Sequence, residues 1–378
     1  MQNIILAFLT SLLAVIFGIP SIITVAKLKG LYDKPDFRKL HTNKIPRLGG
    51  VAIVAGFSIA VSLWGLTQGM DDRLQYLQAA LIILFFSGLK DDIIALSPMK
   101  KLGTQIIATL ITVVGQGILI TNFHGLFGLE VIPTWLSYVL TIFTIIVITN
   151  SFNLIDGVDG LAGGIGLITS ITFGLWFYSI DQIAWSVLAF GLAGSLLGFL
   201  VFNFNPARIF MGDAGSLCTG FLLSIFAVKF IQFNGPDAAT LDKITSAPGI
   251  AIAILIVPLF DTLRVFVLRV LNKKSPFAAD KNHIHHSLIK IGLTHKEVSL
   301  IMYLANIVFV TIAYLLRDSS TNVIIAIIGT LAIVLAQIPV YMFNHKLQDL
   351  EAENSDLIPE DLVVTQAKVK TKEKAVNN

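Results

Sequence analysis

Charged residues are scarce in this chain of 378 residues. Asp, Glu, Lys and Arg together supply 13% of the sequence, about half of the share that is usual in soluble domains. Hydrophobic residues supply 55%, and the mean hydropathy is +0.80. This composition excludes an ordinary water-soluble domain, and no nucleic-acid partner is expected. It indicates a protein whose solvent is a lipid bilayer.

Cysteine is almost absent as well. The single cysteine, Cys218, lies in an apolar segment, so no disulfide can form within the chain. A metal site built from several thiolates is excluded for the same reason. We expect Cys218 to be a small buried apolar side chain.

Apolar runs long enough to cross a membrane recur along most of the sequence. The first run is too long and too weakly charged at its N-terminus for a cleavable signal, and no small-residue cleavage pattern precedes Lys27. Because a transmembrane helix needs about 20 mostly apolar residues, we predict an all-α, polytopic membrane bundle of about eleven transmembrane helices without a soluble domain between them. The predicted spans are centred near Val15, Gly56, Ile83, Val113, Ile145, Ile168, Leu192, Ile225, Leu259, Val308 and Val334.

Basic residues fall mainly on one side of the predicted spans. Of the 27 Lys and Arg residues, 23 lie on one side and 4 on the other. Cytoplasmic loops carry the excess of Lys and Arg, which predicts an N-terminus outside and a C-terminus in the cytoplasm. We expect residues 1–345 to form a transmembrane catalytic domain with cytoplasmic active-site loops. Residues 346–378 are expected to form a flexible cytoplasmic tail.

Five polar motifs lie on the predicted cytoplasmic side. The first is a basic loop from Asp33 to Gly50, whose last residues include Arg47 and a glycine pair. Such a loop suits contact with phosphate, since glycine allows close backbone approach. The second motif is Asp91-Asp92, close to Lys101. A carboxylate pair is either a hydrated helix end or part of a site for a divalent ion or a phosphate.

The third motif repeats Asn and Asp in steps of three: Asn150, Asn153, Asp156 and Asp159. On a continuous helix, these side chains would turn by about 60° per step. The glycines that follow predict an interrupted helix instead, which would let these oxygens converge on one polar pocket. The alternative is a solvated turn between two spans.

The fourth motif runs from Phe202 to Ser216. It includes Asn203, and it places Asp213 between glycines just before an apolar run. Oxygen ligation of a hard cation is sterically easy at such a position, so Asp213 is the first choice for a metal ligand. The alternative for this aspartate is a helix N-cap.

The fifth motif is Asp280-Lys281-Asn282-His283-Ile284-His285-His286. The three imidazoles cannot all face one zinc ion on a regular helix, and no cysteine supports them. Donation of hydrogen bonds to phosphate oxygens fits them better. The five motifs together indicate metal-assisted phosphoryl transfer on the cytoplasmic face, with a lipid as one substrate.

Four of these motifs, in the same order, closely resemble those of the bacterial polyprenyl-phosphate N-acetylhexosamine-1-phosphate transferases. They are Asp91-Asp92, Asn150 to Gly164, Phe202 to Ser216 and Lys274 to His286. This family is related to phospho-N-acetylmuramoyl-pentapeptide translocase and to the eukaryotic dolichyl-phosphate enzyme. The resemblance covers the chain from about Asp33 to Gly292.

The resemblance implies transfer of a sugar 1-phosphate from a UDP-N-acetylhexosamine, here UDP-GlcNAc, to undecaprenyl phosphate with release of UMP. This reaction is the first membrane step of a cell-surface polysaccharide in a bacterial inner (plasma) membrane. Asn153 and Asp213 would hold Mg²⁺, with Mn²⁺ as the alternative. The residues expected at the reacting groups are Asp91, Asp92, Asp156, Asp159 and His285. Those expected to bind phosphates or the nucleotide are Arg47, Lys101, Asn150, Asn203, His283 and His286.

Several alternatives stay open. Pro46 to Gly50 and the interrupted His-Ile-His-His resemble enzymes that start O-antigen, teichoic acid or capsule chains, and argue against the pentapeptide translocases. Direct displacement and a phosphorylated aspartate are both possible, and a homodimer is suggested by kinship alone. From another class, an ion-coupled secondary transporter would need carboxylates at the bilayer midplane and related halves. The sequence has no internal repeat, and its carboxylates cluster at loop boundaries.

Overall fold

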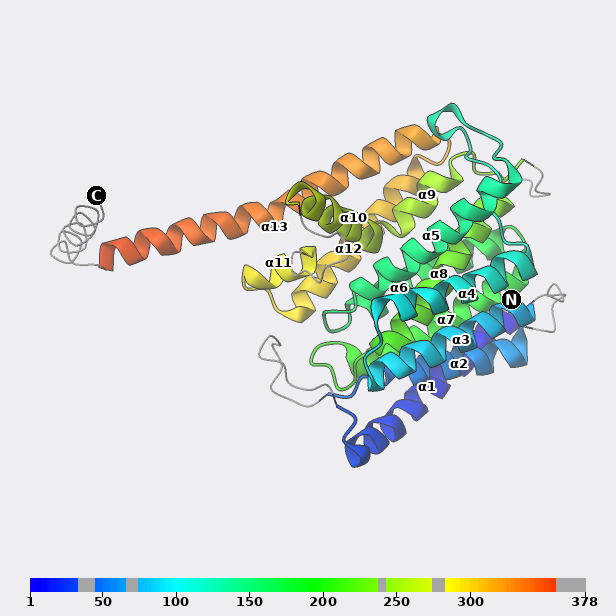
Figure 1. Ribbon diagram of the computed structural model, residues 1–378, viewed down its shortest axis with the longest axis horizontal. Coiled ribbons are helices and arrows are strands. Elements are labelled where there is room, and N and C mark those ends of the chain that lie inside the picture. The colour runs from blue at the N-terminus through cyan, green and yellow to red at the C-terminus, as the bar shows by residue number, and fades with distance from the viewer. Residues whose placement is uncertain (33–44, 66–73, 237–242, 274–282, 358–378) are drawn as a thin grey trace.

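The computed structural model describes residues 1–32, 45–65, 74–236, 243–273 and 283–357. This part of the chain is helical apart from its loops and one isolated antiparallel bridge. Most of the long helices run side by side in one bundle (Figure 1). The helices are α1 (Gln2–Lys29), α2 (Gly49–Trp64), α3 (Leu74–Ile93), α4 (Pro98–Gln116), η2 (Leu126–Gly128), α5 (Thr134–Leu154), α6 (Leu161–Ser179), α7 (Ile183–Asn203), α8 (Gly212–Phe233), α9 (Ala247–Ile254), α10 (Ile256–Leu271), α11 (Ile284–Lys290), α12 (His295–Leu315) and α13 (Thr321–Leu357).

The all-α, multi-pass architecture is confirmed. In the described residues, seven helices are long and apolar enough to cross a membrane, and the bent pair α9 and α10 makes up to eight. The seven are α1, α5, α6, α7, α8, α12 and the part of α13 up to Phe343. Each of the eleven predicted spans coincides with a helix or with the bent pair. Because α2 is only 16 residues long and neither α3 nor α4 meets the same criterion, the number eleven stays a prediction.

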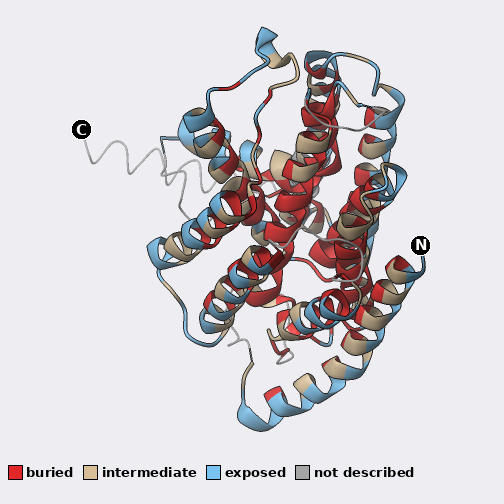
Figure 2. Cartoon of the chain, turned by 90° about the vertical axis from the view of Figure 1, so that its right-hand side faces the viewer, coloured by how far each residue is buried: buried red, intermediate tan, exposed pale blue. Residues whose placement is uncertain are grey.

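Helix α8 lies in the interior of the bundle. Of the residues in its most apolar stretch, 94% are buried, against 28% in α1 and 28% in α13. Buried residues line the interior, whereas the outward faces of the helices carry exposed positions (Figure 2). Many of these exposed side chains are large and apolar, such as Phe17, Phe86 and Phe143, as expected where lipid replaces water around a helix. The first turn of α8, which carries Asp213, is thus held by neighbours on several sides.

The span predicted around Leu259 is broken. Helices α9 and α10 meet at Leu255 with a bend of 83°. The break leaves carbonyls without helical partners, and the Thr169 hydroxyl of α6 donates to one of them, that of Ile254, at 3.5 Å. Asp261 lies on α10 beyond this bend and is buried.

The two ends of the bundle differ. The N-terminus lies at the end opposite to α11, while the C-terminal half of α13 projects beyond the end that carries α11 (Figure 1). Helix α13 continues to Leu357, so the tail predicted to begin at residue 346 starts with helix. Residues 358–378 lie outside the described part of the chain.

Candidate active site

The predicted functional residues gather at one end of the bundle. This end is built from the last turns of α3, α5 and α7, the first turns of α2, α4, α6 and α8, and the short helix α11. Side chains from these helices contact one another across long stretches of sequence, as the following distances show. The basic residues between Asp33 and Lys44, and Asp280 beside the histidines, lie outside the described residues.

Lys101 lies at the centre of the carboxylate cluster. Its Nζ is 2.8 Å from Asp213 Oδ1, 3.3 Å from Asp91 Oδ2 and 3.4 Å from Asn153 Oδ1. Asn153 also donates from Nδ2 to Asp213 Oδ1 and to Ser216 Oγ, both at 2.6 Å. Three helices, α3, α5 and α8, therefore place oxygen atoms around the positive charge that α4 supplies. The single ammonium group offsets part of the charge of the two carboxylates.

This cluster has the chemistry of a site for a hard divalent cation. Two carboxylates and a carboxamide oxygen are ligands that Mg²⁺ prefers, and Mg²⁺ keeps part of its shell for water and substrate phosphates. A closed protein cage is absent: the described residues contain no group of three or more His, Cys, Asp or Glu side chains arranged to hold a metal ion. The donor set of Asp91, Asn153 and Asp213 thus fits a metal whose shell is completed by substrate. It does not fit a structural zinc site.

Asp92 points to a different partner from its neighbour Asp91. Its Oδ1 accepts the backbone N–H of Asp213 at 2.7 Å, and its Oδ2 accepts that of Ala214 at 3.0 Å. Asp91 instead accepts the backbone N–H of Leu96 at 2.5 Å and faces Lys101. Asp92 therefore satisfies free N–H groups at the start of α8 and fixes the turn from which Asp213 projects.

The glycine pair of the first motif packs against the same turn. The N–H groups of Gly49 and Gly50 donate to the carbonyls of Phe210 and Met211 at 2.9 and 2.8 Å. A Cβ on Gly50 would lie 2.1 Å from the backbone nitrogen of Gly215. Close approach of α2 to α8 thus requires glycine at this position.

Asp156 lies in the loop after α5 and faces the same cluster. Its carboxylate accepts the N–H of Gly212, and Asp213, Asp92 and Arg47 act on its charge. Removal from water raises the pKa of Asp156 well above its ordinary value, and the negative charges of Asp213 and Asp92 raise it further. This shift favours the neutral carboxyl group, which can donate to a phosphate oxygen that a carboxylate would repel.

Asp159 and Asn203 join two loops at this end of the bundle. Asp159 Oδ2 accepts the N–H of Ala207 at 3.1 Å. Asn203 Oδ1 accepts the N–H of Gly160 at 2.9 Å, and its Nδ2 donates to the Ile209 carbonyl at 2.9 Å. Both side chains are buried. They hold the loop after α5 beside the loop after α7, so their described contacts are to protein groups.

Two partners of the predicted residues were not foreseen from the sequence. Gln105 and Asn150 exchange hydrogen bonds of 3.1 and 2.6 Å between their amide groups. His295, at the start of α12, has its Nδ1 at 3.3 Å from Asp159 Oδ1. Gln105 follows Lys101 by four residues on α4 and so shares its face, a signal that could have identified it. His295 carried no comparable signal.

The three histidines pack ring against ring at the start of α11. The ring centroids of His283 and His285 are 5.3 Å apart, and those of His285 and His286 are 4.4 Å apart. Burial, reinforced by the charges of His285 and His283, lowers the pKa of His286 to about 4. His286 is therefore neutral near pH 7, and it can offer a phosphate a hydrogen bond but no positive charge.

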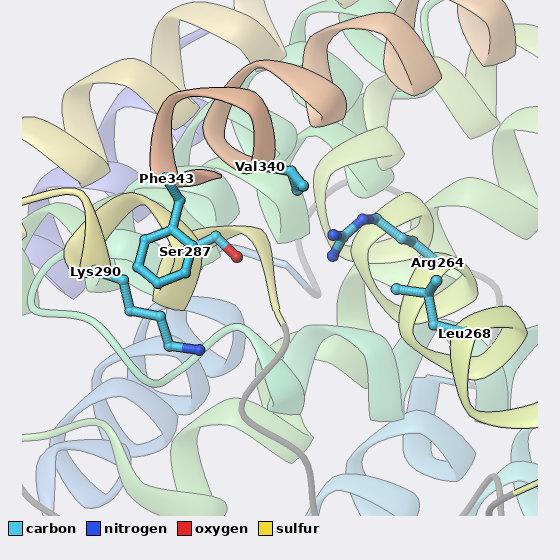
Figure 3. Close-up of a pocket in the computed structure, with 6 residues that line it drawn as sticks. All are labelled: Arg264, Leu268, Ser287, Lys290, Val340 and Phe343. Atoms are coloured by element: carbon cyan, nitrogen blue, oxygen red, sulfur yellow. The ribbon is translucent and has the colours of Figure 1, made fainter. Parts of the chain in front are cut away.

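A hollow of about 210 Å³ lies beside the histidines, between α10, α11 and α13. Arg264 and Lys290 stand on opposite sides of it (Figure 3). The rest of the lining is Ser287 and the apolar side chains of Leu268, Val340 and Phe343. A lining with cations beside aliphatic and aromatic groups suits an amphiphile with an anionic head.

Comparison with known proteins identifies the family. Residues 74–231 match the model of glycosyl transferase family 4. The chain is 36% identical over 321 residues, 85% of this chain and 87% of the relative, to a probable undecaprenyl-phosphate N-acetylglucosaminyl 1-phosphate transferase of Bacillus subtilis. It is 32% identical over 324 residues, 80% of each chain, to the decaprenyl-phosphate N-acetylglucosaminephosphotransferase of Mycobacterium tuberculosis.

A third relative is more distant. The undecaprenyl-phosphate alpha-N-acetylglucosaminyl 1-phosphate transferase of Escherichia coli is 27% identical over 300 residues, 78% of this chain and 79% of the relative. All three matches extend well beyond the segment that fits the family model, and they cover most of the described bundle. This chain belongs to glycosyl transferase family 4, in the group of polyprenyl-phosphate N-acetylhexosamine-1-phosphate transferases.

Proposed function

We propose that this protein transfers N-acetylglucosamine 1-phosphate from UDP-GlcNAc to undecaprenyl phosphate and releases UMP. The observation that carries the proposal is the convergence of Asp91, Asn153 and Asp213 on Lys101 at one end of a membrane bundle. The names of the relatives, which are N-acetylglucosamine-phosphate transferases acting on polyprenyl phosphates, support the choice of sugar and acceptor. The product, a lipid-linked sugar diphosphate, would begin a cell-surface polysaccharide.

The reaction exchanges one phosphoanhydride for another. An oxygen of the acceptor phosphate forms a bond to the phosphorus that bears the sugar, and the bond from that phosphorus to the bridging oxygen of UMP breaks. A phosphate monoester has a second pKa near about 6, so the acceptor is largely dianionic at neutral pH and needs little help from a base. We therefore propose direct displacement, and trapping of a phosphorylated aspartate would contradict it.

The protein's side chains would then orient groups and balance charge. Asp213 and Asn153, with Asp91 beside them, would hold Mg²⁺, which when bound neutralises the diphosphate oxygens. Lys101 supplies a fixed positive charge within the same cluster. Asp92 orients the first turn of α8 through its two backbone hydrogen bonds, and Asp156 accepts the N–H of Gly212 beside that turn.

The acceptor would approach from the membrane side of this end. The hollow between α10, α11 and α13 adjoins the histidines: Arg264 is one helical turn from Asp261, and Ser287 donates to the His283 carbonyl at 3.3 Å. Its mixed lining supports a lipid-borne phosphate as the second substrate. The three carboxylate and amide motifs lie at helix ends, which argues against the transporter alternative. We propose that this end faces the cytoplasm.

Release of UMP tests the proposal. Membranes that contain the protein would receive undecaprenyl phosphate and Mg²⁺, with UDP-GlcNAc or UDP-MurNAc-pentapeptide offered separately. We expect UMP with UDP-GlcNAc, no UMP after chelation of Mg²⁺, and none from the Asp213→Ala variant. Release of UMP only with UDP-MurNAc-pentapeptide would assign the protein to the peptidoglycan branch. No release of UMP with either nucleotide would contradict the proposed donor.

A further inference from the structure

One buried carboxylate in this part of the molecule has no place in the mechanism above. Asp261 lies on α10, and its side chain is fully buried. Its Oδ1 accepts the backbone N–H of Ile284, the first residue of α11, at 2.8 Å. Its Oδ2 lies 3.0 Å from His283 Nδ1 and 3.5 Å from His285 Nδ1. A single carboxylate thus contacts the backbone and two rings at the start of α11.

We infer that Asp261 is a positioning residue that fixes the tautomer of His283 through a hydrogen bond and, through the packed rings, the orientation of His285. The catalytic part of this inference rests on the proposed function. A carboxylate can only accept hydrogen bonds, so the ring nitrogen that faces it must carry the proton. The His283 ring then holds hydrogen on Nδ1, and its Nε2 is turned away from Asp261 with its lone pair available when the ring is neutral. His285 Nδ1 has no hydrogen-bond partner in the described residues, so its ring is held by packing against His283.

The Nε2 atom of His285 points toward the loop that carries Asp156. Its Nε2 lies 3.2 Å from the place that a Cβ on Gly157 would occupy. The neighbouring ring of His283 is nearly parallel to that of His285, with an interplanar angle of 13°. Rotation of either ring would therefore disturb the other. A carboxylate that orients a histidine through its far nitrogen is also the arrangement that sets the tautomer in catalytic and metal-binding histidines.

Stability of the fold alone does not account for the contacts of Asp261 with the two histidine rings. A buried carboxylate is costly in a membrane helix unless it is paired and hydrogen-bonded. A neutral acceptor on α10 could take the hydrogen bond from the Ile284 N–H and anchor α11 without the cost of a buried charge. The two additional ring contacts connect Asp261 to residues that lie beside the loop of the proposed active site. Asp261 and the histidines do not form a metal site, because the described residues contain no group of three or more His, Cys, Asp or Glu side chains arranged to hold an ion.

The Asp261→Asn variant tests the inference directly. Its amide oxygen can still accept from the Ile284 N–H, but its NH₂ group would face the rings and favour the opposite tautomer, with hydrogen on Nε2. We expect kcat for UMP release to fall by about 100-fold or more, a smaller loss than the roughly 10⁴-fold of the comparable change in a Ser-His-Asp triad. KM for both substrates should change by less than about threefold.

The tautomer can be measured without any turnover. The chain has 7 histidines, so ¹⁵N spectra of histidine-labelled protein in lipid are tractable, and His283→Gln and His285→Gln assign the two signals. For His283 we expect Nδ1–H in the wild type and Nε2–H in Asp261→Asn. The matched control is Thr262→Val, because the Thr262 hydroxyl has no hydrogen-bond partner within the described part of the chain. It should keep both the tautomers and kcat.

The outcomes separate the two proposals. Wild-type tautomers and wild-type kcat in Asp261→Asn would overturn the inference. If Asp261→Asn does not fold, the wild-type spectrum decides, since an Nε2–H signal for His283 would also overturn the inference. If the tautomers respond as expected but the wild type releases no UMP, the proposed function fails and the positioning of the rings stands.

Discussion

At the scale of single residues, the adjacent carboxylates of Asp91 and Asp92 are divided between two tasks. Asp91 faces the ammonium of Lys101 at 3.3 Å, whereas both oxygens of Asp92 accept backbone N–H groups at the start of α8. In its ionised form, Asp92 also complements the positive end of that helix. Asp92 therefore acts on the site chiefly by fixing the direction in which Asp213 projects.

Asp92→Asn should lower turnover more than substrate binding. The amide nitrogen of the introduced asparagine cannot accept a backbone hydrogen bond as the carboxylate oxygen does. The first turn of α8 therefore loses one hydrogen bond, and Asp213 shifts. A small displacement of a catalytic group can cost up to about 100-fold in rate, and we expect kcat to fall by about 10- to 100-fold with KM for UDP-GlcNAc nearly constant. The same substitution at exposed Asp181, at the far end of the bundle, is the matched control. An unchanged kcat in Asp92→Asn would contradict the role of Asp92 in positioning Asp213.

His286 gives the protein a pH dependence of stability. Its pKa is lowered to about 4 in the folded state, against about 6.5 in an unfolded chain. Between these values the unfolded state binds more protons, so stability falls as pH falls through that window. Melting temperatures at pH 7 and pH 5 should therefore differ more in the wild type than in His286→Gln. Equal differences in the two proteins would show that His286 is not the responsible group.

The sequence identified individual site residues well where a motif carried them. Asp91, Asn153, Lys101 and Asp213 were each singled out by their type and by their place at the end of an apolar run, and the structure brings all four together. Asp261 was missed although it is a lone carboxylate in an apolar helix. Its importance depends on contacts with residues more than twenty positions away, and no local pattern encodes such contacts.

At the scale of elements, the close packing of the first turn of α2 against α8 constrains the site. The Gly50 position leaves no room for a side chain, since a Cβ there would lie 2.1 Å from Gly215 N and 2.5 Å from Gly215 Cα. Both obstacles are backbone atoms, so no rotamer change can relieve them. The two helices would have to separate at the turn that carries Asp213.

Gly50→Ala should therefore reduce both stability and turnover. Forcing extra atoms into a packed interior costs about 1–3 kcal/mol, and displacement of the α8 turn should lower kcat as well. Gly18→Ala on α1 is the matched control, since a Cβ at Gly18 meets nothing within 4 Å. Thermal unfolding in detergent and UMP release measure the two effects. Wild-type values for Gly50→Ala would contradict the packing described here.

Helix positions followed from hydropathy, but breaks and ends did not. The continuous apolar composition around Leu259 predicts one straight span. In the structure, α9 and α10 meet there at an angle of 83°. The bend is stabilised by tertiary contacts such as that of Thr169 with the Ile254 carbonyl. Helix α13 likewise continues to Leu357, past the residue where the sequence turns polar, because a polar sequence can extend a helix that an apolar span has already nucleated.

At the scale of the whole molecule, the proposed cytoplasmic orientation of the site rests on the distribution of Lys and Arg. The motifs and the projecting half of α13 lie at one end of the bundle, and the N-terminus lies at the other (Figure 1). Of the 27 Lys and Arg residues, 23 belong to the side of the motifs in the sequence. The excess of Lys and Arg marks the cytoplasmic side of a membrane protein, which is also the side where nucleotide sugars are available to an enzyme.

This orientation predicts which positions a membrane-impermeant thiol reagent can reach. The only native cysteine, Cys218, is buried, and Cys218→Ser gives a background free of thiols. In intact cells, a cysteine placed at exposed Asp181, between α6 and α7, should react from outside. One placed at exposed Lys100, beside the carboxylate cluster, should react only after the membrane is permeabilised. The reverse pattern would place the site outside, where UDP-GlcNAc is absent, and would contradict the proposed reaction together with the predicted topology.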